Sequence, residues 1–244
     1  MKISVISPIL APPLKPGEPD QRTQFRLRDC ARVPADFEFS YIEKGPRFIQ
    51  NAYDEAYAAP HLIRRIVQAE QEGADAIVIN CSADTAIRAC REAVSVPVVA
   101  PAESAMLFAP QLADTFAVLS FAERVNGRFV RIAHALGLSR RLTCVRSVEI
   151  DFDDIGGGGA PVADAGFVAI NEIHADRHCD GFLLGCTDFE DAAPVLLEKL
   201  QREDLGVVLL KPFEISIHQA YAAASMRLRS GRNSYPPPCD IFAG

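Results

Sequence analysis

Apolar and polar residues follow two periods along this sequence, one typical of buried strands and one typical of helices. Short runs such as 74–80 (ADAIVIN) and 180–185 (DGFLLG) are almost continuously apolar, as strands inside a parallel sheet are. Between such runs, apolar residues recur every three to four positions, which predicts helices with one buried face. Strands are expected at 2–9, 37–42, 74–80, 97–100, 115–121, 142–150, 180–185 and 206–210.

The helical stretches separate these strands. Pro60 stands where a helix can begin, because the first helical residue needs no backbone N–H, and Gly73 is a stop signal. The segment 43–56 before it is interpreted as a loop, and so is the proline-rich and charged region 10–35. Helices are expected at 60–73, 84–94, 124–138, 163–179, 188–203 and 213–229.

Alternating strands and helices predict an α/β fold of parallel sheets flanked by helices. The order also repeats, because Cys81 follows Asp75 by six residues and Cys186 follows Asp180 by six, in DAIVINCS and DGFLLGCT. A repeat of about a hundred residues predicts two pseudo-symmetric lobes with the active site in the cleft between them. The expected parts are a first lobe at 1–112, with the helix 213–229 packing back on it, a second lobe at 113–212, and an irregular tail at 230–244.

Charge and cysteine usage narrow the functional classes. A net charge of −7 argues against a nucleic-acid partner, which needs a basic face to meet phosphates. No window has the roughly 18 consecutive apolar residues of a membrane helix, and the N-terminus lacks the pattern of a secretory signal. Seven cysteines without a CxxC pair or a disulfide pattern favour a cytoplasmic protein with reduced thiols.

Two cysteines stand where chemistry is expected. Cys81 and Cys186 each follow a predicted buried strand, and ligands of α/β sheets bind beyond the carboxyl ends of strands. A thiol there lies near backbone N–H groups and a helix N-terminus, which favour the thiolate. Two lobes could place a base on one face of a substrate carbon and an acid on the other. A single such cysteine is usually a packing residue, but the matched pair, each followed by a hydroxyl residue (Ser82, Thr187), favours chemistry.

Four of the other five cysteines are expected to be inert. Cys90 lies on the apolar face of a predicted helix, and Cys144 lies in an apolar strand. Cys30 and Cys239 fall in segments interpreted as irregular. None of these four is expected to take part in a reaction.

The residues around the two cysteines resemble the aspartate/glutamate/hydantoin racemase superfamily. The first half is most similar to hydantoin and allantoin racemases, and the second half has the LGCT element of amino-acid racemases. Hydantoin-type members usually have an Asn-Pro-Asn-like element after the first strand, where this sequence has Ser-Pro-Ile. They commonly have a Phe-Asp-Asp-Pro-like run after the first cysteine, where it has Ser-Ala-Asp-Thr. The matching stretches are 45–60 (GPRFIQNAYDEAYAAP), 73–99, 101–106 (PAESAM), 116–125 (FAVLSFAERV) and 183–189 (LLGCTDF).

The resemblance implies roles for individual residues. It makes Cys81 and Cys186 the two acid/base residues, and it makes Ser82, Ala83 and Thr187 donors at helix starts that hold a substrate carboxylate or carbonyl. It implies a small-molecule substrate, no cofactor, no metal ion and a homo-oligomer. The loops that would line the same pocket contribute Ser7, Pro8, Ile9, Gly45, Pro46, Phe48, Ser120 and Phe121.

Three other features have plainer interpretations. Four glycines from Gly156 to Gly159 are not followed by Gly-Lys-Ser/Thr, so they indicate a flexible connection, with a lid over the cleft as the alternative. His174 and His178 have a spacing that can bind metal, but no further ligand set is evident. Glu103 is expected at a helix N-terminus, where a carboxylate is favourable.

The sequence therefore predicts a cofactor-independent racemase or epimerase acting at a carbon next to a carbonyl. A 5-substituted hydantoin or a related ureide is the favoured substrate. The alternatives are an amino-acid racemase of the aspartate/glutamate type, and a decarboxylase or cis–trans isomerase that uses one cysteine. A further alternative is a non-catalytic binding protein of two lobes, whose thiols would keep the ordinary pKa of about 8.5.

Overall fold

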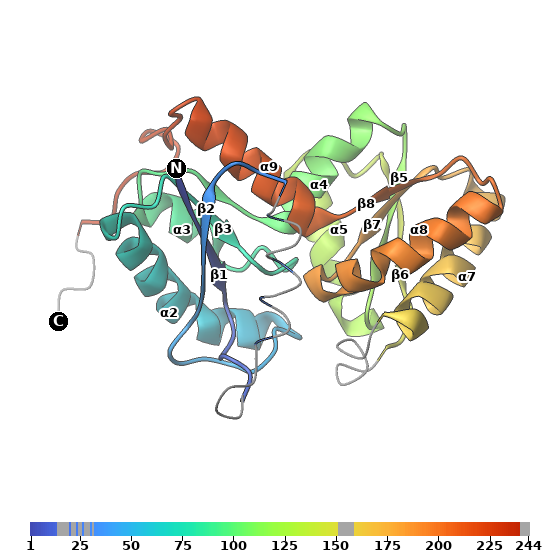
Figure 1. The fold of residues 1–244 in the computed structure, drawn as a ribbon, viewed down its shortest axis with the longest axis horizontal. Coiled ribbons are helices and arrows are strands. Elements are labelled where there is room, and N and C mark those ends of the chain that lie inside the picture. The colour runs from blue at the N-terminus through green and yellow to red at the C-terminus, as the bar shows by residue number, and fades with distance from the viewer. Residues whose placement is uncertain are drawn as a thin grey trace. The chain divides into compact units, whose positions relative to one another are not determined.

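The computed structural model describes residues 1–13, 20, 23, 26, 30, 32–150 and 159–239. The chain forms two compact units, which are described one at a time (Figure 1). The first comprises Met1–Pro101 and Ser216–Gly244, and the second comprises Ala102–Ile215. These units divide the chain at 101/102 and 215/216, whereas the sequence pattern predicts limits at 112/113 and 212/213.

The first unit is built on a four-stranded parallel sheet in the order β2-β1-β3-β4. β3 is buried along its whole length, which explains its continuously apolar sequence. β2, at the edge of the sheet, is only partly buried and alternates apolar with polar residues. The strands are β1 (Lys2–Ser7), β2 (Asp36–Tyr41), β3 (Ala76–Ile79) and β4 (Val98–Val99).

The second unit repeats this topology. Its parallel sheet has the order β6-β5-β7-β8, so each strand takes the place of the strand four numbers earlier. The predicted α/β class with two parallel sheets flanked by helices is confirmed. The strands are β5 (Phe116–Ser120), β6 (Leu142–Ser147), β7 (Gly181–Leu184) and β8 (Val208–Leu210).

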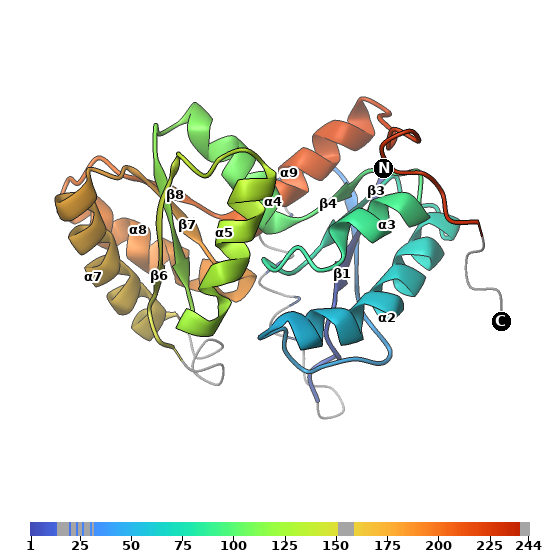
Figure 2. The same cartoon turned by 180° about the vertical axis from the view of Figure 1, so that it is seen from behind.

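Helices of the first unit cover its sheet. Figure 2 shows α2 (Ala52–Gln71) and α3 (Ile87–Ala93) side by side along the sheet. On α2, residues at helical spacing are fully buried, among them Leu62 and Ile66, and they pack in one cluster with Ile77 of β3. The last ten residues of α9 (Pro212–Ser225) also belong to this unit, where α9 buries Ile217, Ala220 and Ala224.

The start of α2 corrects the sequence-based prediction. The helix begins at Ala52, not at Pro60, so residues 52–56 of the expected loop are helical. Asn51 is the N-cap, because its side chain accepts a hydrogen bond from the Asp54 backbone N–H at 3.0 Å. Asp54 in turn accepts one from the Gln50 N–H at 2.9 Å, which resembles a capping box. Pro60 is tolerated because it is exposed, so water can bind the backbone carbonyl that its missing N–H leaves without a partner.

We expect Asn51→Ala to lower the free energy of unfolding by about 0.5–2 kcal/mol, because it removes this cap. Asn51→Asp should keep most of the stability, because a carboxylate also accepts from the first turn. Urea denaturation followed by circular dichroism measures both variants. An Asn51→Ala protein as stable as the parent would mean that the helix starts later than Ala52.

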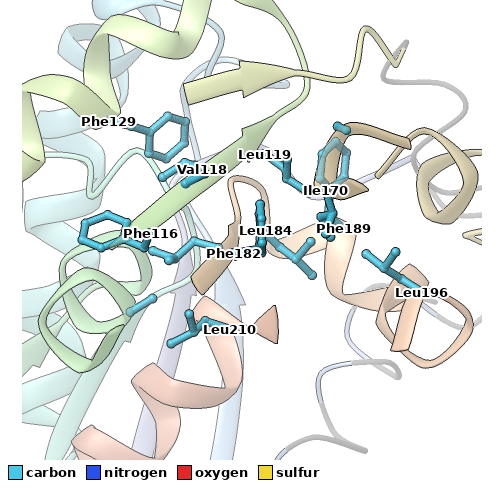
Figure 3. Close-up of a cluster of buried hydrophobic side chains, with 14 of the residues drawn as sticks. Phe116, Val118, Leu119, Phe129, Ile170, Phe182, Leu184, Phe189, Leu196 and Leu210 are labelled. Atoms are coloured by element: carbon cyan, nitrogen blue, oxygen red, sulfur yellow. The ribbon is translucent and has the colours of Figure 1, made fainter. Parts of the chain in front are cut away.

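The second unit has a core on both faces of its sheet (Figure 3). Val118 of β5 packs with Phe129 of α5 (Asn126–Ala135) on one face, and Leu119 lies with Ile170 and Phe189 on the other. Burial of each such side chain stabilises the fold by about 1.5–3 kcal/mol. The α-helices are α4 (Pro101–Phe108), α5 (Asn126–Ala135), α7 (Ala160–Arg177) and α8 (Ala193–Arg202), and the 3-10 helices are η1 (Ala109–Gln111), η2 (Glu123–Val125) and η3 (Thr187–Ala192).

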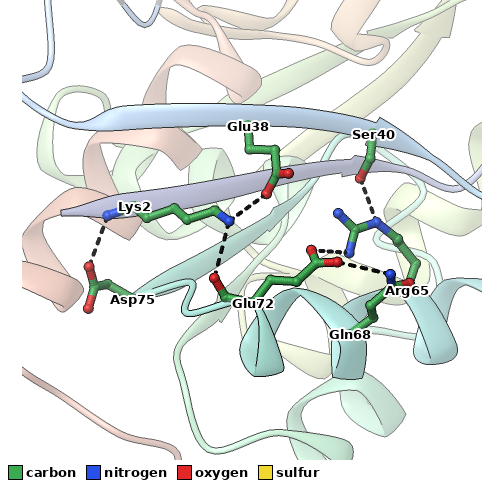
Figure 4. A network of polar contacts seen from close by, with 7 residues as sticks. All are labelled: Lys2, Glu38, Ser40, Arg65, Gln68, Glu72 and Asp75. Carbon is green, nitrogen blue, oxygen red and sulfur yellow. Dashed lines mark hydrogen bonds and ion pairs between the residues drawn. The ribbon is translucent and has the colours of Figure 1, made fainter.

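A polar network joins the start of β1 to the end of α2 (Figure 4). The Lys2 ammonium lies 2.9 Å from Glu38 of β2 and donates to the Glu72 carbonyl at 3.2 Å. Arg65 bridges the same elements, since it donates to Ser40 and to the Glu72 carboxylate, each at 3.0 Å. Partly exposed ion pairs of this kind contribute up to about 1 kcal/mol each, so the network aligns elements that the core already holds.

A second polar cluster ties α2 to the loop before β4. The Glu70 carboxylate accepts from the Ser95 backbone N–H at 2.7 Å, from its hydroxyl at 2.6 Å, and from the Val96 N–H at 3.1 Å. Burial alone would raise the pKa of Glu70, but these hydrogen bonds and the charge of Arg232 outweigh it, so the pKa is lowered. Arg232 also donates to the Glu92 carbonyl at 3.2 Å, which anchors the C-terminal segment.

We expect Glu70 to contribute to acid stability with a defined sign. Its folded-state pKa lies below the ordinary value of 4.5, so its contribution is present above pH 4.5 and is lost as the pH falls through the folded value. Glu70→Gln should therefore lower stability at neutral pH and flatten the loss of stability below pH 4.5. Thermal denaturation across a pH series measures this. An unchanged slope in the variant would contradict the assignment.

Three further observations concern earlier expectations. Thr23, Arg26 and Cys30 are helical, and the last two are buried, so the region 10–35 is not wholly irregular. Gly156, Gly157 and Gly158 lie outside the described residues; Gly159, with φ of +80°, precedes α7, and a Cβ there would lie 2.9 Å from the Ala192 Cα. No helix in the described ranges has the length and apolar character needed to cross a membrane.

Candidate active site

The two sheets present equivalent edges at the carboxyl ends of their central strands. In the first, Ile6 of β1 pairs with Ile79 of β3, and the Asn80 N–H then donates to the Ile6 carbonyl at 2.8 Å. In the second, Leu119 of β5 pairs with Leu184 of β7, and the Gly185 N–H donates to the Leu119 carbonyl at 2.7 Å. Each is the point where the strand order reverses, which is where α/β sheets bind ligands. Cys81 and Cys186 come one residue later.

Cys81 lies half-buried in a turn after β3. Its carbonyl accepts from the Asp84 N–H at 3.0 Å, and the hydroxyl of the buried Thr85 lies 3.9 Å from its Sγ and can donate to it. A donor at sulfur favours the thiolate, and sequence reasoning missed Thr85. The expected helix start at Ser82 and Ala83 is wrong, because α3 begins only at Ile87 and both residues lie in the turn.

Strained backbone holds this turn. Asp84 and Ala86 have φ of +50° and +51°, in the left-handed region that favours glycine. Such residues cost about 1–3 kcal/mol each and cluster at functional sites. Left-handed residues cannot continue a right-handed α-helix, so α3 begins only after Ala86.

Both neighbours of Cys81 in the chain bury an oxygen atom without a hydrogen-bond partner. They are Oδ1 of Asn80 and Oγ of Ser82, and no group in the described part of the chain bonds to either. Buried polar atoms are usually paired, and each exception asks for a reason such as a bound ligand or a catalytic role. The described residues thus leave two polar atoms beside Cys81 that a ligand or an ordered water molecule can bind.

Cys186 has different surroundings. It is half-buried and is the N-cap of η3, and its carbonyl accepts from the Phe189 N–H at 3.1 Å. Thr187, as expected, begins a helical segment, because η3 leads directly into α8. Gly185 is required before the cysteine, since a Cβ there would lie only 2.7 Å from the Leu119 carbonyl oxygen.

The loops after β1 and β2 lie together in the first unit. The Leu10 N–H donates to the Pro46 carbonyl at 3.0 Å, which brings Ile9 and Gly45 into neighbouring loops. Gly45 has φ of +153°, and a Cβ there would lie 2.4 Å from the Ile42 side chain. Four predicted pocket residues are buried or partly buried here: Ser7, Pro8, Pro46 and Phe48.

The loop after β5 is held by buried side chains and by hydrogen bonds within the second unit. Ser120 is fully buried, and its hydroxyl donates to Oδ1 of Asn126 and lies 3.5 Å from the Ala122 carbonyl. Phe121 is also buried, with the Arg124 guanidinium 5.8 Å from its ring centre. Ser120 and Phe121 thus lie at the carboxyl end of β5, as the sequence predicts. The Ser120 hydroxyl, however, donates its proton to an acceptor within the second unit.

Glu190 was not singled out from the sequence. It is buried on η3, four residues after Cys186, and its carboxylate accepts from the backbone N–H groups of Phe213 and Glu214. A carboxylate at a helix N-terminus satisfies N–H groups that have no partner within the helix, so Glu190 caps α9. The N-cap would have been hard to find, because the partners are more than twenty residues apart.

Three of the other cysteines have a thiol pKa that burial raises. All seven cysteines are reduced thiols. Burial raises the pKa of the Cys90 thiol to about 12, against a weak opposing effect of Arg91. Burial also raises the pKa of Cys144 and of Cys179. Since the thiolate is the reactive form, these three are poor nucleophiles.

We expect iodoacetamide to distinguish these groups in the native protein near pH 8. Cys81, Cys186 and the exposed Cys239 should be alkylated, whereas Cys90 should stay unmodified because almost none of it is thiolate. Peptide mass spectrometry after timed labelling measures each site, and denatured protein is the control in which all sites react. Labelling of Cys90 as fast as Cys239 would contradict the burial described above.

The described residues contain no cluster of three or more His, Cys, Asp or Glu side chains that could hold a metal ion. His174 instead has its Nδ1 at 3.0 Å from the Cys179 carbonyl and 3.5 Å from the Asp180 carboxylate. His178 ends α7 in the left-handed region. The two histidines thus form part of a helix end.

Comparison with known proteins gives the family. The model of the Asp/Glu/hydantoin racemase family matches residues 26–220. The chain is 29% identical over 204 residues to a hydantoin racemase of Pseudomonas sp. (strain NS671), covering 82% of this chain and 78% of that protein. It is 28% identical over 199 residues to a hydantoin racemase of Paenarthrobacter aurescens, covering 81% and 82%. The chain belongs to the Asp/Glu/hydantoin racemase family, and it is thus an isomerase of the racemase type.

Solved structures share its fold. The allantoin racemase from Klebsiella pneumoniae superposes with a TM-score of 0.84 at 17% identity, over 100% of this chain and 96% of that one. The allantoin racemase from Pseudomonas fluorescens gives the same TM-score and identity over 100% of both chains. At this identity the likeness concerns the fold.

Proposed function

We propose that the protein racemises a 5-substituted hydantoin or a related ureide by transferring one carbon-bound proton between Cys81 and Cys186. The observation that carries the proposal is the equivalence of the two thiols. Each follows the central strand pair of its sheet by the same number of residues, and each is half-buried while Cys90 and Cys179 are packed away. The proposal requires that both thiols reach the same substrate carbon from opposite faces.

The chemistry follows from the acidity of a C–H next to a carbonyl. One thiolate removes the proton, so the C–H bond breaks, an S–H bond forms, and the electron pair moves into the enolate. Hydrogen-bond donors near the carbonyl oxygen stabilise the negative charge that develops there. The opposite thiol then donates its proton to the other face of the carbon and becomes the thiolate, so the reaction needs no oxidant and no co-reactant.

The substrate class rests on the relatives. Proteins named hydantoin racemase match about four fifths of this chain, and proteins named allantoin racemase share its fold over the full length. A ring or chain with alternating N–H and carbonyl groups would suit a site that buries the Ser82 hydroxyl oxygen without a partner in the described residues. The homo-oligomer that the family resemblance implies is part of the same proposal, and light scattering measures it.

The test follows both optical rotation and deuterium uptake at C5 of a 5-substituted hydantoin in D2O. Cys81→Ala and Cys186→Ala should each lower the racemisation rate by about 10²–10⁴-fold, because each removes one acid/base group. The remaining thiol should still exchange the proton of one enantiomer without inverting it, and the two variants should prefer opposite enantiomers. Cys239→Ala, at an exposed thiol outside the site, is the matched control and should keep the parent rate.

The outcomes separate the alternatives. Full racemisation by either single variant would refute the two-thiol mechanism. Loss of activity in only one of them would indicate a reaction that uses a single cysteine, such as a decarboxylation. Racemisation of aspartate or glutamate, with no action on hydantoins, would instead support the amino-acid alternative.

A further inference from the structure

We infer that Asn80 is a positioning residue that turns the Ser7 hydroxyl proton toward the substrate's carbonyl oxygen. The inference rests on the proposed function and concerns how the enolate is stabilised. Asn80 acts through Ser7 and does not itself touch the reacting atoms. Its position directly before Cys81 follows from the strand register of the first sheet.

The contact itself is specific. Asn80 Nδ2 donates to Ser7 Oγ at 3.2 Å, across the ladder between the ends of β1 and β3. The backbone on both sides is fixed, because the Asn80 N–H donates to the Ile6 carbonyl at 2.8 Å and the Ile42 N–H to the Ser7 carbonyl at 3.3 Å. A hydroxyl has one proton to donate and two lone pairs to accept with. Since Asn80 occupies a lone pair, the Ser7 proton remains for another acceptor.

In the second unit, the equivalent serine donates a hydrogen bond to its amide neighbour instead of accepting one. Ser120 donates its proton to Asn126 Oδ1, with the Ala122 carbonyl as a second inward acceptor. Gly185 stands where the first unit has Asn80, and a side chain there would collide with the Leu119 carbonyl. Of the two equivalent serines, Ser7 accepts from its amide neighbour and keeps its proton to donate, whereas Ser120 donates its own.

Only one of the two polar atoms of the Asn80 amide has a hydrogen-bond partner among the described residues. Oδ1 of Asn80 is buried and finds no partner in the described ranges, so the residue leaves one end of its amide unsatisfied while the other holds Ser7. Buried amide atoms are usually paired, so an unpaired one asks for a reason, which can be a functional constraint. Holding the hydroxyl next to the Cys81 turn is the constraint that the geometry supplies.

The oriented Ser7 hydroxyl holds the developing oxyanion of the substrate in one position. When the C–H bond breaks, negative charge develops on the carbonyl oxygen, and a donor that is already oriented stabilises it without reorganisation. Because only the first unit provides this serine proton, the oxygen binds on the same side whichever thiol acts. The donor then serves both directions of the reaction.

A double-mutant cycle tests the inference with Ser7→Ala, Asn80→Ala and the double variant, using either hydantoin enantiomer. Ser7→Ala should lower kcat by about 10²-fold, the size expected for loss of one oxyanion donor. Asn80→Ala should lower kcat by about tenfold, the size of one net hydrogen bond, with KM within about twofold. In the Ser7→Ala background, Asn80→Ala should change kcat by less than about twofold, because Asn80 acts through Ser7.

Asn126→Ala is the matched control, since it removes the amide partner of the equivalent serine. It should keep kcat within about twofold, with thermal unfolding measured on every variant. Additive losses in the double variant, or a loss in Asn126→Ala as large as in Asn80→Ala, would overturn the inference. Failure of the proposed function is distinguishable, because it would appear as full activity of Cys81→Ala or Cys186→Ala in the parent background.

Discussion

Two backbone hydrogen bonds, from Asn80 to Ile6 and from Gly185 to Leu119, mark where the chain leaves each sheet just before a cysteine. Each closes a parallel strand pair at its carboxyl end and forces the next residue, a cysteine, out of the sheet and into the loop beyond. Parallel pairing is slanted and evenly spaced, so the register of the strands sets where the chain leaves the sheet. The equal placement of the two thiols is a result of this register.

The two units share one strand topology, but the residues around their cysteines differ. Both sheets have the same strand order, yet the cysteines have different neighbours. Cys81 lies in a strained turn with Thr85 near its sulfur, whereas Cys186 caps a 3-10 helix. Four residues after each cysteine stand Thr85 and Glu190, and only the latter caps another helix. The proposed two-thiol reaction therefore requires a thiol from each unit but not the same surroundings for both.

Much of the fold and part of the site could be predicted from the sequence. Buried parallel strands are continuously apolar, so β3 and β7, and the cysteines after them, stood out. The start of α2 was missed because Pro60 is a strong local signal, while the cap at Asn51 depends on a reciprocal contact with Asp54. The left-handed residues in the Cys81 turn, the Asn80–Ser7 contact and the Glu190 cap depend on tertiary neighbours, which no local pattern reveals.

Both chain crossings between the compact units fall in the first turn of a helix that begins with proline. The strand β4 belongs to the first unit while the helix after it belongs to the second, and α9 makes the reverse exchange after β8. The first unit is therefore made of two separate stretches of the chain, whereas the second unit is the single stretch between them. A fragment ending at residue 101 would lack Ile217, Ala220 and Ala224, which are buried and belong to the first unit. Two cuts, one on each side of the second unit, would be needed to separate the halves.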